Sequence, residues 1–174
     1  MSLRGWSALL VGAMGALWWL GVVAIMERDR IQGFLDFWPV ALLGGLGAAP
    51  AGALLARGLG GEGPRGWLIS GFSLLLATFL GAAFGGLLMF LTIQGMEFFG
   101  LFPEAASGNR LMRSMRGEYA VLPLFAPLLI AGVLLEGPPS LLLWLGFAAG
   151  VHLLMRERRR RSAALLPGPK PDPG

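Results

Sequence analysis

Long apolar runs, separated by short charged or Gly/Pro-rich segments, constrain this chain more than any other feature. A helix needs about 20 apolar residues to cross a hydrocarbon core of about 30 Å. Only 14% of the residues are charged, against about 25% in soluble domains. We therefore predict an all-α fold, a polytopic transmembrane helical bundle. Its predicted spans are at about residues 5–26, 37–56, 67–95, 119–136 and 140–155.

The number of spans depends on residues 119–155, an apolar stretch interrupted by the sequence EGPP at residues 136–139. As one helix this stretch would be roughly 55 Å long, which exceeds the hydrocarbon core. Gly137 permits a helix to end, and Pro138 and Pro139 cannot continue it. We predict two short spans that meet in a tight hairpin, which makes five spans. The alternative is four spans with a re-entrant hairpin.

The predicted transmembrane domain covers residues 1–155, followed by a basic and then Pro/Gly-rich cytoplasmic tail, 156–174. Five spans place Arg4, Arg57 and Arg65 on one side and the other eleven of the fourteen basic residues on the opposite side. Basic residues are enriched in cytoplasmic loops. We therefore predict a multi-pass protein of a bacterial inner (cytoplasmic) membrane, with its N-terminus outside and its C-terminus in the cytoplasm. Four spans would leave both termini on one side.

Small residues recur at every fourth position in three of the predicted spans. Such rows let two helix backbones approach closely where lipid supplies no hydrophobic driving force. They serve either contacts within this bundle or contacts with a separate partner helix. The predicted helix-packing residues, two of the rows having the GxxxG pattern, are Gly44, Ala48, Gly52, Gly81, Gly85, Gly146 and Gly150.

Two groups of arginines are predicted to contact lipid or a partner on the cytoplasmic side. The first group lies in the segment 96–118, which we interpret either as an amphipathic helix with a basic face or as a plain solvated loop. The second begins the tail. The residues are Arg110, Arg113, Arg116, Arg158, Arg159, Arg160 and Arg161. The expected partners are membrane lipids and other transmembrane subunits, in a hetero- or homo-oligomer, and not nucleic acid.

Side chains that could catalyse a reaction or bind a cofactor or metal are scarce in this sequence. The chain has no cysteine, and its single histidine, His152, is a weak candidate for a heme or chlorophyll ligand, because a bis-histidine heme needs a second ligand. An interfacial histidine is the simpler interpretation. No Ser-His-Asp, HExxH or P-loop pattern occurs. We expect no catalysis, no cofactor and no metal.

Aromatic and hydroxyl side chains refine this picture. Trp6, Trp38, Trp67 and Trp144 stand near the starts of spans, where interfacial belts are expected. Trp18 and Trp19 are deeper, and we expect them to pack against the Gly/Ala-rich second span.

The leading hypothesis for the function of the protein is a non-catalytic accessory, structural or assembly subunit. The alternative is a small oligomeric transporter or channel component for a neutral or lipid-like solute, which a cavity lined by Thr78, Thr92 and Gln94 would favour.

Overall fold

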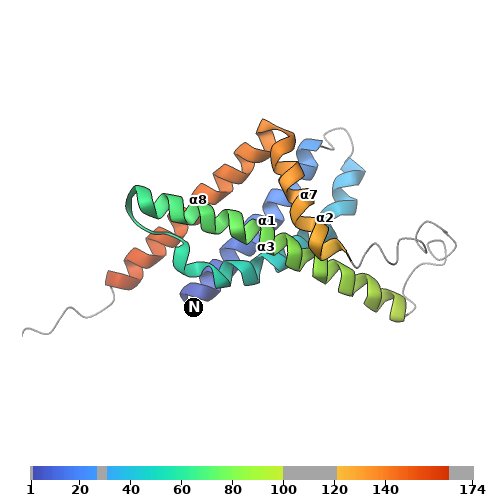
Figure 1. Ribbon diagram of the computed structural model, residues 1–174, viewed down its shortest axis with the longest axis horizontal. Coiled ribbons are helices and arrows are strands. Elements are labelled where there is room, and N and C mark those ends of the chain that lie inside the picture. Colours follow the sequence, from blue (N-terminus) through green and yellow to red (C-terminus); the bar gives the residue numbers. More distant parts are fainter. Residues whose placement is uncertain (1, 27–30, 100–120, 165–174) are drawn as a thin grey trace, which may run out of the picture.

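The computed structural model describes residues 2–26, 31–99 and 121–164. Within these ranges the regular structure is entirely helical, which confirms the predicted fold class at this level, and no strand is present. The elements are α1 (Leu3–Met26), α2 (Ile31–Leu54), the short 3₁₀ helix η1 (Ala56–Gly58), α3 (Gly63–Phe98), α7 (Leu122–Glu136) and α8 (Pro138–Ala164) (Figure 1).

Three of these helices contain segments long and apolar enough to cross a membrane. The segments are Leu3–Val22, Gly63–Thr92 and Pro138–Ala164. The apolar parts of the other two helices are shorter, at Leu42–Leu54 and Pro123–Glu136. The chain thus has the helices of a membrane protein. The prediction of five spans stays a prediction.

Helices α1 and α2 form an antiparallel pair with the most extensive contacts in the described part of the chain. The hydroxyl of Ser7 donates to the carbonyl of Gly52 at 2.6 Å. This contact shows that the start of α1 lies against the end of α2. Helix α2 also packs along α3. Small residues at these contacts bring the backbones close together, and van der Waals packing then stabilises the pairs.

Helices α7 and α8 meet at the predicted break and diverge from it as a hairpin (Figure 1). Gly137 separates them in an extended conformation, with φ −173° and ψ 159°. Helix α7 has 15 residues, about 22 Å at 1.5 Å per residue, which is shorter than a hydrocarbon core of about 30 Å. Helix α8 continues to Ala164, so residues 156–164 of the predicted tail belong to this helix. Residues 165–174 lie outside the described ranges.

Candidate functional site

Five of the seven predicted packing residues lie at contacts between helices. A methyl group added to Gly81 would lie 2.8 Å from Cα of Ala48, and one added to Gly85 would lie 3.3 Å from Cα of Gly44. Gly44 also faces the ring of Trp19, and Gly52 faces α1. These distances are shorter than ordinary van der Waals contacts, so the positions have little room for a side chain.

The remaining two predicted packing residues, Gly146 and Gly150 on α8, have a different environment. A methyl group added at either position meets no atom of another helix within 4 Å in the described part of the chain. This small-residue row is therefore not used between the helices that the structure describes.

Sequence reasoning missed the close backbone contact between α2 and α3 at Gly47. A methyl group there would lie 2.7 Å from the carbonyl oxygen of Gly81 and closer still to the backbone of Gly85. Gly45 was also missed, where an added methyl would lie 2.8 Å from the carbonyl oxygen of Gly12 on α1. The run GGLG at residues 44–47 was the available signal, because it gives α2 small residues on two faces, one toward α1 and one toward α3.

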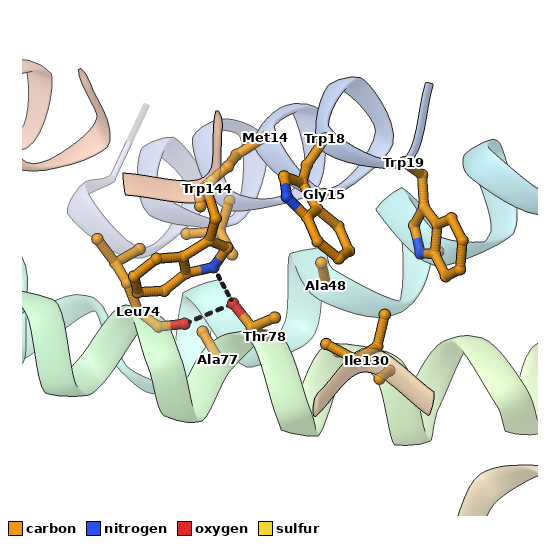
Figure 2. A pocket seen from close by; sticks show the side chains of 14 residues that line it. Met14, Gly15, Trp18, Trp19, Ala48, Leu74, Ala77, Thr78, Ile130 and Trp144 are labelled. Atoms are coloured by element: carbon orange, nitrogen blue, oxygen red, sulfur yellow. Dashed lines mark hydrogen bonds between the residues drawn. The ribbon is translucent and has the colours of Figure 1, made fainter. Parts of the chain in front are cut away.

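A pocket lies in the interior, where α1, α2, α3, α7 and α8 converge (Figure 2). Trp18 and Trp19 of α1 and Trp144 of α8 contribute rings to its wall, and Ala48 and Ile130 contribute smaller apolar groups. The volume is about 40 Å³. A second pocket of about 140 Å³ shares Trp19, Gly44, Ala82 and Ile130 with it and extends to Met89 and Leu129.

Three of the four polar side-chain groups that line the first pocket donate hydrogen bonds within the chain. The indole N–H of Trp144 donates to the hydroxyl of Thr78 at 3.0 Å, and that hydroxyl donates to the carbonyl of Leu74 at 2.8 Å (Figure 2). The indole N–H of Trp18 donates to the carbonyl of Ser140 at 3.3 Å. The pocket therefore presents an apolar surface.

The structure also places the aromatic and hydroxyl residues that the sequence analysis considered. Trp144, predicted near a membrane interface, is buried among the helices, with 7% of its surface exposed. Thr78 lines the first pocket, but Thr92 and Gln94 line neither of the two interior pockets. The hydroxyl of Thr92 donates to the carbonyl of Leu88 in its own helix instead. Trp19 lies against Gly44 on α2, as expected for a large ring beside a Gly/Ala-rich helix.

A second site is the basic end of α8, defined here as residues 155–161, which packs on the loop between α2 and α3. One guanidinium nitrogen of Arg159 donates to the carbonyl of Ala56 at 3.2 Å and to that of Arg57 at 2.7 Å. Arg160 forms an ion pair of 3.1 Å with Glu62. The serine hydroxyl of Ser70 accepts from the N–H of Gly60 and donates to the carbonyl of Gly58, which holds the loop on α3.

The predicted contact arginines of this helix end are thus engaged within the chain to different degrees. Arg159 and Arg160 hold the α2–α3 loop, whereas Arg161 pairs with Glu157 one turn earlier on α8 at 2.8 Å. Arg158 also has an interaction within the chain. Arg110, Arg113 and Arg116 lie outside the described residues, so the interpretation of segment 96–118 is untested.

His152 is buried within the protein, with 1% of its surface exposed. Its ring lies against that of Trp67, with ring centres 3.9 Å apart and planes tilted by 30°. Neither ring nitrogen has a hydrogen-bond partner among the described residues. A buried imidazole without partners is costly, and the stacking on Trp67 is the contact that compensates for part of this cost.

The contacts of the basic end bear on the predicted orientation, which stays a prediction. With five spans, Arg57 and Arg65 would lie across the membrane from Arg159 and Arg160. In the structure Arg159 binds the carbonyl of Arg57 directly, and Arg160 binds Glu62. A loop and a helix end in such contact lie at the same end of the molecule.

No group of three or more His, Cys, Asp or Glu side chains suited to hold a metal ion occurs within residues 2–26, 31–99 and 121–164. The site residues are therefore aromatic rings, small residues and arginines. Neither a protein-family model, nor a curated protein sequence, nor a solved structure matches the chain. The fold defines the class: in its described ranges this is an all-helical protein with three helices long and apolar enough to cross a membrane.

Proposed function

We propose that the protein is a non-catalytic accessory or structural subunit of a bacterial inner-membrane complex, and that α8 contacts a helix of another subunit or of a second copy. The observation that carries this proposal is the uncovered row at Gly146 and Gly150. Small residues four apart let a partner backbone approach closely, and in the described part of the chain no neighbouring helix lies over them. The other two rows face helices of the same chain.

The proposed topology has both termini in the cytoplasm, with α1, α2, α3 and α8 crossing and α7 forming the shorter arm of a re-entrant hairpin. Two observations support it: the length of α7 and the contacts between α8 and the α2–α3 loop. Every arginine of the described ranges also lies at this end, which the positive-inside rule places in the cytoplasm. These residues are Arg4, Arg57, Arg65, Arg156, Arg158, Arg159, Arg160 and Arg161.

A transporter component remains the second candidate, for a lipid-like solute only. The supporting observation is the pair of adjoining interior pockets, whose lining is mostly apolar. A neutral polar solute would need several free donors or acceptors. Among the described residues that line these pockets, the indole N–H of Trp19 is the single polar side-chain group without a hydrogen bond.

The accessory-subunit proposal is tested by replacing Gly146 and Gly150 with leucine in the full-length chain. The matched control is Gly71→Leu, because Gly71 also has open space around it but is flanked one turn away by Trp67 and Leu75 and so belongs to no small-residue row. Chains purified in mild detergent are compared for mass by light scattering and for stoichiometric co-purifying chains by mass spectrometry.

We expect the double variant to lose a partner chain or a second copy that wild type and Gly71→Leu retain. Leucine side chains at both positions would separate the helix backbones by several ångströms, which removes close packing. Identical assemblies for all three chains would overturn the proposal.

A further inference from the structure

An open concavity of about 710 Å³ lies at the end of the molecule where the described arginines gather. Its wall consists of the first residues of α3, Gly63, Pro64, Trp67 and Leu68, together with Arg156 of α8. It is separate from the two interior pockets, with which it shares no lining residue.

The charges around this concavity favour an anion. Nε of Arg156 is buried and has no hydrogen-bond partner among the described residues. The first turn of α3 contains no acidic side chain and includes the exposed Arg65, and the N-terminal end of a helix carries partial positive charge. Of the acidic residues nearby, Glu62 is paired with Arg160 and Glu157 with Arg161.

The apolar rim of the concavity continues along α3 in the direction of the predicted membrane core. Leu68 is 75% exposed, and Phe72, one turn further along the same face, is 70% exposed. Trp67 lines the concavity and stacks on the buried His152, and tryptophan is a residue type enriched at membrane interfaces. A cationic end followed by an exposed apolar track matches a molecule with an anionic head and hydrocarbon chains.

We propose that this concavity binds the headgroup of an anionic phospholipid, with the phosphate between Arg156 and the N-terminus of α3 and an acyl chain along Leu68 and Phe72. Basic pockets at the cytoplasmic ends of transmembrane helices recognise anionic headgroups in this way. The inference rests on the membrane placement and topology proposed above, and it is independent of the partner helix on α8.

The test is native mass spectrometry of the full-length chain, purified in mild detergent and mixed with phosphatidylglycerol or phosphatidylcholine. Wild type should retain phosphatidylglycerol in preference to phosphatidylcholine. Arg156→Gln should retain about tenfold less phosphatidylglycerol, because a hydrogen-bonded charge is lost. Arg156→Lys keeps the charge and should recover part of the retention. The matched control, Arg161→Gln, removes the same charge from the same helix end and should behave as wild type.

Two further measurements, one on a variant and one by competition with phosphate, also test the proposal. Leu68→Ser changes an exposed side chain and should lower phosphatidylglycerol retention a few-fold without unfolding the chain, even if Arg156→Gln fails to fold. Inorganic phosphate at millimolar concentration should not displace the lipid. Equal retention by Arg156→Gln and Arg161→Gln, no preference over phosphatidylcholine, or displacement by inorganic phosphate would each overturn it. A variant that loses the lipid but keeps its oligomer supports this inference without bearing on the accessory-subunit proposal. A variant that loses its oligomer but keeps the lipid bears on the accessory-subunit proposal alone.

Discussion

At the scale of single residues, the environment of each glycine matters more than its membership in a GxxxG pattern. Gly47 belongs to none of the predicted rows, yet α2 and α3 are closest there, and an added methyl group would overlap the backbone of α3. Gly71 lies within a long helix with no atom within 4 Å of an added methyl group in the described part of the chain. Replacement of glycine by alanine should therefore have opposite effects on stability at Gly47 and at Gly71.

We predict that Gly47→Ala lowers the free energy of unfolding by about 1–3 kcal/mol, because overpacking forces the helices apart. Gly71→Ala should raise it by about 0.5–1 kcal/mol, because alanine favours the helical conformation more than glycine does. Both can be measured by circular dichroism during unfolding in one detergent. If Gly47→Ala is as stable as Gly71→Ala, the close contact between α2 and α3 is refuted.

At the scale of elements, α8 has two parts with different roles. Its first half buries Trp144, Ala148 and Val151 in the core, whereas its basic end extends past Met155 and binds the α2–α3 loop. The backbone of Gly60, at φ +74°, approaches so closely that an added methyl would lie 2.6 Å from the carbonyl carbon of Met155. Only glycine adopts this conformation readily, and its lack of a side chain permits the contact.

We predict that Arg159→Ala loosens the α2–α3 loop, because the carbonyls of Ala56 and Arg57 lose their charged donor. Amide hydrogen exchange of residues 55–62 should become roughly fivefold faster, which corresponds to the loss of about 1 kcal/mol of local stability. Arg161→Ala is the control, since Arg161 pairs with Glu157 in its own helix and does not contact the loop. Equal exchange rates in the two variants would contradict a structural role for Arg159.

At the scale of the whole molecule, the contacts determine which segments share one end. The start of α1, the α2–α3 loop and the basic end of α8 lie together, and the apex where α7 meets α8 lies away from them (Figure 1). The proposed topology, with an even number of crossings, brings these segments to one side of a membrane. It corresponds to the four-span alternative, which the length of residues 119–155 made the second choice.

The absence of cysteine makes this topology directly testable by single-cysteine labelling, because the chain has no background reactivity. Cysteines replacing Arg65 and Ser162, both exposed, should react with an impermeant maleimide from the same, cytoplasmic side in inside-out vesicles. A cysteine replacing Phe99, which is exposed at the end of α3, should react from the opposite side. Labelling of Arg65→Cys and Ser162→Cys from opposite sides would restore the five-span topology.

The sequence by itself determined the helical class, the approximate helix positions and the break at residues 136–139. These features depend on local properties: apolar length, and the inability of Gly137 and Pro138 to continue a helix. It also identified the small residues that could pack. The sequence did not decide which of these small residues do pack. A helix presents small residues on several faces, and the face that meets another helix depends on how the other helices of the chain pack.

Tertiary structure alone decided the burial of Trp144 and His152, the use of Gly47, and the contact of Arg159 with Ala56. Each of these joins residues from different helices, and Ala56 and Arg159 are 103 positions apart in the chain. No local pattern encodes such a pairing, because it depends on how all the helices pack at once. In the proposed topology the membrane side of each loop follows from that packing and from the short length of α7, neither of which a count of charges along the sequence contains.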